Sequence, residues 1–167
     1  MEKILLPGTD SLERKVLILG GVGGIGKTQL AITYAKRHRA SYTSVFWLNA
    51  QSETALVRSL QLLARRILAP DAVSEVDADC LWIQVSTWLS NLDNTRWLLI
   101  FDNHDEPYQY TIENYYPYVS HGSIIITTRL PDRLTGEKIK VQPMADDKDS
   151  MDILATRSDR SNIESGE

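Results

Sequence analysis

The segment that decides the fold is residues 16–28, which read VLILGGVGGIGKT. Its first part, Val16–Gly20, is a short and continuous apolar run, typical of a strand that is covered by helices on both faces. Its second part, Gly21–Thr28, matches the pattern G-x-x-x-x-G-K-[ST] and leads into a helical pattern over Lys27–His38. Because this pattern binds phosphate when a strand precedes it and a helix follows it, the segment predicts a phosphate loop.

Each residue type in this loop has a physical role in holding an anion. Glycines allow successive backbone N–H groups to face one anion, and the N-terminus of the following helix adds positive potential. The pattern predicts that Lys27 reaches the β- and γ-phosphates of a nucleotide and that the Thr28 hydroxyl binds Mg²⁺. The alternative, an ordinary glycine-rich turn, is disfavoured by the flanking strand and helix. The predicted nucleotide-binding residues are Gly21, Gly23, Gly24, Ile25, Gly26, Lys27, Thr28 and Gln29.

The rest of the chain alternates between strand and helix patterns. Three continuous apolar runs predict fully buried strands, and a weaker alternating run predicts an edge strand: Val45–Leu48, Trp97–Asp102, Ser123–Thr127 and, for the edge, Lys138–Gln142. Helical periodicity is present at Glu53–Ala69 (with Ser52 as its N-cap), Asp79–Leu92 and Asp146–Thr156. Such alternation produces right-handed βαβ units. We therefore predict an α/β fold of three layers, a five-stranded parallel sheet with helices on both faces.

The composition is that of one globular domain. The chain has 167 residues, of which 43% are hydrophobic and 24% are charged, and these are ordinary values for a single domain. Within it we expect an N-terminal extension at 1–13 and a nucleotide-binding P-loop domain at 14–145. We expect the start of a helical segment and a polar tail at 146–167.

Charge and hydropathy exclude several classes of function. The net charge of −4 argues against nucleic acid as a partner, and the apolar runs of about five residues are far below the roughly 20 that a membrane helix needs. The single cysteine, Cys80, excludes a disulfide framework. The chain starts without a secretory signal pattern, so we expect a cytoplasmic protein. The first 66 residues hold 10 of the 18 Lys and Arg but only 4 of the 22 Asp and Glu, and this charge would suit an anionic ligand there. The alternative for Lys36, Arg37 and Arg39 is that they only complement the C-terminus of a helix.

A nucleotide site of this type needs groups from neighbouring strands. Asp102 ends an apolar run, where its carboxylate can hold the hydration shell of Mg²⁺. Arg129 follows the next run, and ligands of open α/β sheets bind beyond the carboxyl ends of the strands. Arg129 is therefore predicted to sense a γ-phosphate, the alternative being an exposed loop arginine. The predicted catalytic residues are Lys27, Asp102 and Arg129, and the predicted metal ligands are Thr28 and Asp102.

Motifs of other nucleotide-hydrolysing classes are missing from the sequence. A GTPase would have a D-x-x-G motif at the acid that ends the second nucleotide-binding strand, here Asp102, and an N-K-x-D motif for guanine. Neither motif occurs. An ABC-type signature, LSGGQ, and an arginine-rich lid of the kind found in small-metabolite kinases are also absent. These absences argue against those three classes.

Four stretches in the right order and spacing resemble the NB-ARC-type nucleotide-binding domain of STAND P-loop NTPases, as in fungal NOD-like receptors. They read VLILGGVGGIGKTQLAITYAKRH, YTSVFWLNAQSE, RWLLIFDN and GSIIITTR, and the resemblance covers roughly residues 14–145. It implies a sheet in which a sensor strand separates the Walker A and Walker B strands. It also implies ATP/ADP binding, an ADP-held resting state, and an ATP-linked switch in innate-immunity signalling. The implied protein partners are relatives or downstream signalling proteins.

The sequence also departs from this family pattern. Many relatives have a second acid directly after the Walker B Asp, where this chain has Asn103, and an amide is no general base. Asp105 or Glu106 are possible substitutes, so we expect slow or absent hydrolysis and at most a slow ATPase. The helical and winged-helix domains that follow in the family are missing, which indicates an excised domain or a naturally short protein. Two alternatives stay open: a truncated regulator or decoy that pairs with other proteins, and an active P-loop ATPase of another branch.

Overall fold

The structure is a computed structural model that describes residues 1–6, 13–68 and 78–142. Its strands are β1 (Lys15–Gly20), β2 (Ser44–Asn49), β3 (Trp97–Asp102), β4 (Ser123–Thr128) and β5 (Glu137–Lys140). Its α-helices are α1 (Glu2–Leu5), α2 (Lys27–Arg37), α3 (Glu53–Ile67) and α4 (Ala78–Leu89). Short 3-10 turns are η1 (Arg39–Ser41), η3 (Leu92–Asn94), η4 (Ile112–Tyr115) and η5 (Pro131–Arg133). The helix predicted at Asp146–Thr156 lies outside the described residues.

The five strands form one parallel sheet in the order β2-β3-β4-β1-β5. The strand that precedes the phosphate loop, β1, and the strand that ends in Asp102, β3, both pair with β4, which therefore separates them. In the register, Gly20 lies beside Thr128 and Asn49 beside Asp102. The carboxyl ends of four strands thus meet at one edge of the sheet, which confirms the predicted strand arrangement.

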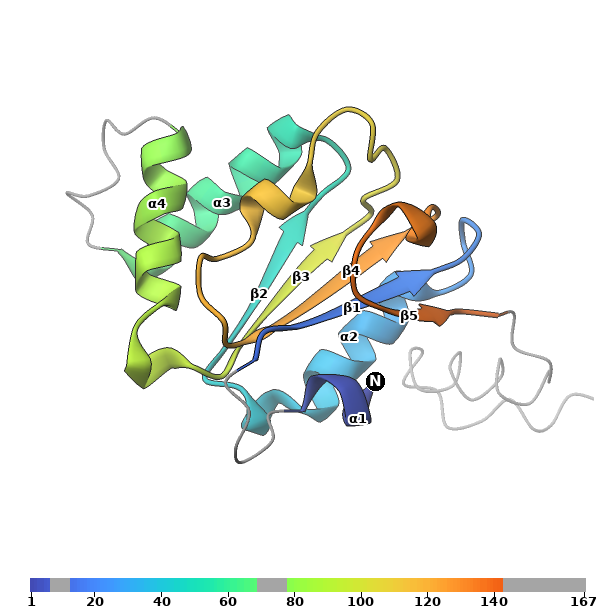
Figure 1. Cartoon of the computed structure of the whole chain (residues 1–167), viewed down its shortest axis with the longest axis horizontal. Helices are drawn as coiled ribbons and strands as arrows, with labels where there is room; N and C mark the ends of the chain where they lie inside the picture. Colours follow the sequence, from blue (N-terminus) through green and yellow to red (C-terminus); the bar gives the residue numbers. More distant parts are fainter. Residues whose placement is uncertain (7–12, 69–77, 143–167) are drawn as a thin grey trace, which may run out of the picture.

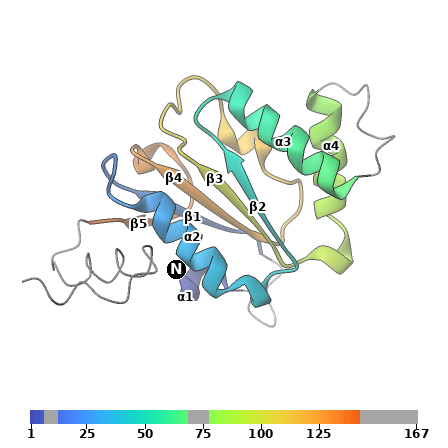
Figure 2. The same ribbon diagram turned by 180° about the vertical axis from the view of Figure 1, so that it is seen from behind.

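Helices cover both faces of this sheet, as predicted. Figures 1 and 2 show α3 and α4 on one face and α1 and α2 on the other. Neighbouring residues of a strand point to opposite faces, so each central apolar strand contributes to two cores. In β3, Leu99 and Phe101 pack in the core under α3 and α4, whereas Leu98 and Ile100 pack in the core under α2. Continuous apolar runs are the sequence signature of this double burial.

One predicted strand is less buried than the sequence indicated. Val45–Leu48 was expected to be covered on both faces, but only Leu48 of β2 is buried, and Trp47 is 40% exposed. β2 lies at the edge of the sheet, pairs only with β3 and is packed by α3. An edge strand has a free side, and this explains why an apolar run is not enough to predict full burial.

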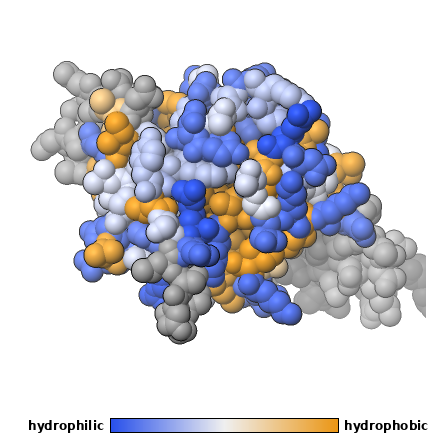
Figure 3. Space-filling model, viewed as in Figure 1, coloured by the Kyte–Doolittle hydropathy of each residue, from blue (hydrophilic) through white to orange (hydrophobic). Residues whose placement is uncertain are grey.

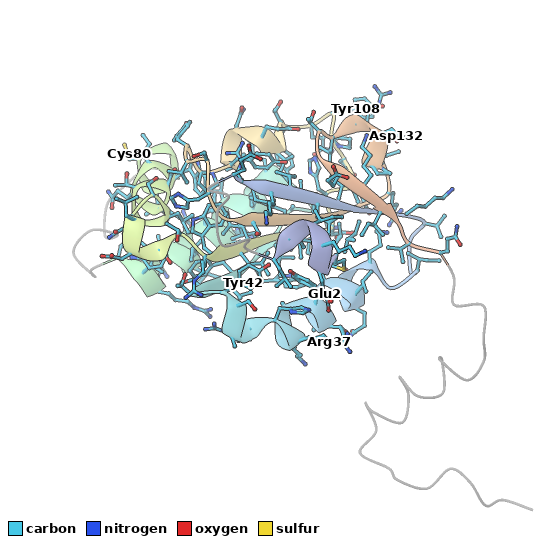
Figure 4. All side chains as sticks on the ribbon, turned by 60° about the horizontal axis from the view of Figure 1, so that its bottom comes forward. Glu2, Arg37, Tyr42, Cys80, Tyr108 and Asp132 are labelled. Carbon is cyan, nitrogen blue, oxygen red and sulfur yellow. The ribbon has the colours of Figure 1, made fainter. Side chains whose placement is uncertain are left out.

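The three predicted helices that fall within the described residues agree with α2, α3 and α4 to within three residues at each end, and Ser52 caps α3 as expected. Its Oγ accepts a hydrogen bond from the backbone N–H of Ala55 at 3.2 Å. At the other end of the chain, α1 packs onto β1 with Leu5 fully buried. The Tyr42 hydroxyl and the Ser123 hydroxyl both donate to the Leu5 carbonyl, at 3.2 and 3.0 Å. Figure 4 shows Tyr42 and Glu2 on this side of the molecule.

The face of the molecule drawn in Figure 3 is a mixture of hydrophilic and hydrophobic areas. Figure 3 shows hydrophilic side chains over much of one face, with smaller hydrophobic areas between them. Among the described residues, no helix has the length and apolar character that crossing a bilayer would require.

Candidate functional site

The loop between β1 and α2 has the backbone geometry that the sequence pattern predicted. Gly24 and Gly26 adopt φ values of +75° and +95°, in the left-handed region that favours glycine. Gly26 is also the N-cap of α2, so the helix begins at Lys27 with its N-terminus directed at the loop. A Cβ atom built at Gly24 or Gly26 would meet no atom within 4 Å. The loop therefore has open space beside these two glycines and lies at the positive end of a helix, where an anion can be held.

Lys27 lies inside this loop and is buried. Its Nζ donates hydrogen bonds to the carbonyls of Gly21 at 2.8 Å and Val22 at 3.0 Å. An ammonium has three protons, so this geometry leaves one for a ligand oxygen. Burial is the main cause that lowers the pKa of Lys27, while Asp105 raises it, Arg129 lowers it and Asp102 raises it. The lysine is thus placed among the charged groups that the neighbouring strands supply.

The first turn of α2 and the end of β3 are joined through Asp102. Its Oδ1 accepts hydrogen bonds from the Thr28 hydroxyl at 2.8 Å and from the Thr127 hydroxyl at 2.6 Å. Carboxylate and hydroxyl oxygens are the hard donors that Mg²⁺ prefers, and neighbouring ligands of an octahedral Mg²⁺ are separated by about 3 Å. The two predicted metal ligands therefore fit that ion in type and spacing. Among the described residues, there is no cluster of three or more His, Cys, Asp or Glu that could hold a metal ion alone.

Arg129 lies above the phosphate loop and is held by Asp105. One carboxylate oxygen of Asp105 accepts the backbone N–H of Arg129 at 2.7 Å, and the other contacts Nε of its guanidinium at 2.7 Å. A Cβ atom at Gly23 would lie 3.4 Å from Cζ of Arg129. The guanidinium therefore lies next to the phosphate loop at Gly23, within van der Waals reach of a Cβ atom at that position.

Asn103 follows Asp102 in a left-handed conformation with φ of 68°, the only positive φ of a non-glycine residue among the described residues. Asparagine tolerates this conformation better than most residue types. Its backbone N–H donates to the Thr127 hydroxyl at 2.8 Å. The turn places Asn103 beside the phosphate loop, where it lines the same cavity.

His104 anchors this turn in the protein interior. Its backbone N–H donates to the Thr127 carbonyl at 2.9 Å, and its buried ring contacts the Tyr110 hydroxyl through Nδ1 at 3.1 Å. Tyr110 donates its proton to the Ala50 carbonyl at 2.6 Å, so Nδ1 of His104 carries a proton and donates to Tyr110. Burial lowers the pKa of His104, with Glu113 as the largest opposing influence. Hydrogen bonds to Thr127 of β4 and, through Tyr110, to Ala50 at the end of β2 therefore hold the loop that follows Asp102.

The phosphate loop, the start of α2 and residues at the ends of β3 and β4 line one cavity of about 350 Å³. It brings together most residues that the sequence predicted and three that it did not assign to the nucleotide: Gly23, Gly24, Ile25, Gly26, Lys27, Thr28, Gln29 and Arg129, with Asn103, Asp105 and Thr127. Gly21 is outside the lining and contributes its carbonyl to Lys27, and Asp102 lies behind Thr28 and Thr127. Thr127 could have been found as a polar residue that ends an apolar strand, whereas the Asp105 contact has no local sequence signal.

Comparison with known proteins agrees with this geometry. The family model described as NB-ARC domain matches residues 2–158. A nucleotide-binding leucine-rich repeat (NLR)-like protein of Hyaloscypha variabilis is 28% identical over 155 residues, covering 81% of this chain and 16% of that protein. The chain therefore spans only a small part of the curated relative that it matches.

Solved structures share the fold. A STAND protein with a tetratricopeptide repeat sensor from Pyrococcus horikoshii matches with a TM-score of 0.51 and 18% identity, covering 90% of this chain and 24% of that one. A chain of Drosophila ORC bound to DNA matches with a TM-score of 0.60 and 14% identity, covering 93% and 44%. Cdc6p from Pyrobaculum aerophilum matches with a TM-score of 0.53 and 16% identity, covering 87% and 43%. At these identities the matches support the P-loop fold alone. The family-model match extends over nearly the whole chain, and the chain therefore belongs to the NB-ARC domain family.

Proposed function

We propose that this domain binds ADP and ATP with Mg²⁺ and that the bound nucleotide sets the state of a cytoplasmic STAND-type signalling protein. The observation that carries the proposal is the convergence of Lys27 and Arg129 on one cavity beside the Thr28–Asp102 pair. Phosphoryl groups need cations, backbone N–H groups and a metal ligand set in one place, and this arrangement offers all three. The phosphate-binding residues would be the glycines of the loop with Ile25, Lys27, Thr28 and Gln29.

The metal would be held by Thr28 and Asp102. Mg²⁺ keeps several of its waters and binds through one or two protein oxygens together with phosphate oxygens, which suits this small donor set. When bound, it would neutralise charge on the terminal phosphates. Arg129 would add a charge-assisted contact to a γ-phosphate, which ADP lacks.

Slow hydrolysis is part of the proposal. A phosphoryl-transfer site must orient the attacking water as well as neutralise charge. Asn103 lines the cavity where many relatives have an acid, and an amide oxygen can accept a hydrogen bond from water but cannot remove its proton. Asp105 is engaged on both carboxylate oxygens by Arg129, which argues against a role as the base. A nucleotide that stays bound for long is what a switch requires.

The signalling role is inferred from the relatives. One relative is named as an NLR-like protein and one structural neighbour as a STAND protein with a repeat sensor. Because the chain covers 16% of the first protein and 24% of the second, the oligomerisation, protein partners and role in innate immunity are proposals for the whole protein of which such a domain is a part.

Nucleotide binding is tested by thermal unfolding of the purified chain with ADP, ATP and GTP. A ligand at about 100 times its Kd stabilises the folded state by about 2.7 kcal/mol, which corresponds to a shift of several degrees. Lys27→Ala should remove most of the ADP and ATP shift, because it removes the cation inside the loop. Lys36→Ala, an exposed lysine on the same helix, is the matched control and should keep it. An equal shift in wild type and Lys27→Ala, or a preference for GTP, would contradict the proposal.

A further inference from the structure

The carboxylate of Asp105 contacts Arg129 at two points, and nothing in the phosphate-loop pattern requires this contact. Its Oδ1 accepts the backbone N–H of Arg129, and its Oδ2 pairs with Nε of the side chain, both at 2.7 Å. A single carboxylate therefore fixes the main chain and the guanidinium of one residue at the same time. The Asp105 side chain is 15% exposed, whereas that of Arg129 is 61% exposed.

An exposed arginine without a partner samples many rotamers, because its side chain has about 2 kcal/mol of rotamer entropy to lose on ordering. Asp105 removes much of this freedom before any ligand arrives. The ion pair uses Nε, so the terminal nitrogens Nη1 and Nη2 lie outside that contact. The guanidinium lies over Gly23, with Nη2 3.5 Å from the place of a Cβ atom there. The N–H groups of Nη1 and Nη2 are thus held at the wall of the phosphate cavity.

Asp105 is itself held by the loop that precedes it. Its backbone N–H donates to the Asn103 carbonyl at 3.0 Å, and the neighbouring His104 is fixed to the Thr127 carbonyl by its backbone and to Tyr110 by its ring. The carboxylate also lines the cavity and raises the pKa of Lys27 as the largest electrostatic influence on it. Asp105 therefore pairs with one cation of the site, Arg129, and acts electrostatically on the other, Lys27.

We propose that Asp105 is a positioning residue that presents Arg129 to the terminal phosphate of ATP and so determines how strongly the domain distinguishes ATP from ADP. This inference rests on the proposed nucleotide function. Asp105 makes no contact with the nucleotide in this role and acts through Arg129. Preorganising a donor lowers the entropy that binding would otherwise lose, and only ATP has the phosphate that benefits. The opposite role has its own chemistry: a carboxylate that interacts with two cations can mimic a phosphate and exclude it. The two roles predict opposite changes.

The test is the ratio of the Kd for Mg·ADP to the Kd for Mg·ATP, measured by calorimetric titration of the full chain. Asp105→Ala should lower this ratio roughly three- to tenfold, mainly by weakening ATP, since one long side chain must now be ordered on binding. Asp105→Asn keeps one oxygen acceptor and the shape of the side chain, so its ratio should be intermediate. In an Arg129→Ala background, Asp105→Ala should leave the ratio unchanged, because the group it positions is gone. Asp132→Ala is the matched control, because Asp132 is an exposed carboxylate, 97% accessible, on the neighbouring loop (Figure 4).

Three results would overturn the inference. A ratio that rises in Asp105→Ala would make Asp105 an inhibitory anion, and an unchanged ratio in both Asp105 variants would make the contact structural only. A further fall in the double variant would show that Asp105 acts independently of Arg129. If wild type binds neither nucleotide, both this inference and the proposed function fail. If wild type binds both and Lys27→Ala abolishes binding, the proposed function holds and the Asp105 variants decide this inference alone.

Discussion

The hydroxyl of Thr28 donates a 2.8 Å hydrogen bond to Oδ1 of Asp102, 74 residues further along the chain. This bond joins the first turn of α2, the helix that follows β1, to the end of β3. In the sheet, β4 lies between β1 and β3. The bond brings one hydroxyl and one carboxylate oxygen together beside the phosphate loop. The pairing is possible because parallel strands end at the same edge of the sheet, and there the helix after β1 begins.

Magnesium should strengthen ATP binding through this pair. In wild type, ATP titrated with Mg²⁺ should bind more tightly than ATP titrated with EDTA. Thr28→Ala and Asp102→Asn should each reduce that difference by roughly tenfold or more, which is the loss found even for partners one step removed from a metal. Thr28→Ser keeps the hydroxyl and is the control. A magnesium effect that survives in Thr28→Ala would exclude Thr28 as a ligand.

Arg129→Ala should weaken ATP binding more than ADP binding. A charge-assisted hydrogen bond to the γ-phosphate contributes about 1.5–3 kcal/mol, or roughly 10- to 150-fold in Kd. Arg133→Ala is a suitable control, because the Arg133 guanidinium stacks on Tyr108 at 5.1 Å from the ring centre and is exposed. Both Kd values are measured by calorimetric titration. Equal losses for the two nucleotides would make Arg129 a structural residue.

The sequence predicts most of the fold because its strongest signals are local. Continuous apolar runs located β1, β3 and β4 to within a residue, and the glycine pattern located the loop between β1 and α2. The four-residue helix α1 was not predicted, because it is too short for periodicity and is held by contacts from Tyr42 and Ser123. The prediction that β2 is buried on both faces was wrong, because the position of a strand within a sheet depends on all the other strands.

In the candidate site, too, some features have a local sequence signal and others depend on how the strands pair. Lys27, Thr28 and Asp102 were assigned from a motif and a strand end, and these are properties of short segments. The link between Asp105 and Arg129 joins two loops 24 residues apart, and it exists only because β3 and β4 are neighbours in the sheet. The left-handed turn at Asn103 depends on the Thr127 hydroxyl. Contacts of this kind require the register of the strands, which a single sequence does not give.

Gly122→Ala should destabilise the fold strongly. Gly122 has φ of +88°, and a Cβ atom there would lie 2.3 Å from Cε2 of Trp97, which is fully buried. Backbone strain and overpacking each cost about 1–3 kcal/mol. Gly24→Ala separates the two effects, because Gly24 has φ of +75° but open space around its Cβ position. In urea unfolding without nucleotide, Gly122→Ala should lose more free energy of unfolding than Gly24→Ala; similar losses would mean that Trp97 moves aside.

Asn103→Asp should raise the rate of phosphate release. Asn103 lines the phosphate cavity, and the substitution places there a carboxylate, which can act as a general base. Wild type should turn over far below the roughly 1–10³ s⁻¹ of ordinary enzymes. The positive φ at this position suits Asp nearly as well as Asn, so the loop should keep its shape.

The rate is measured as steady-state phosphate release from ATP, with ADP affinity measured in parallel. Asn103→Gly is the control for the backbone, because glycine accepts the same φ and supplies no base. If the missing acid limits hydrolysis, Asn103→Asp should be faster than wild type, Asn103→Gly should not, and ADP affinity should be nearly the same in all three. A wild-type rate within the ordinary enzyme range would contradict slow hydrolysis, because Asn103 would then be sufficient to orient the attacking water, and the domain would act as an enzyme in its own right.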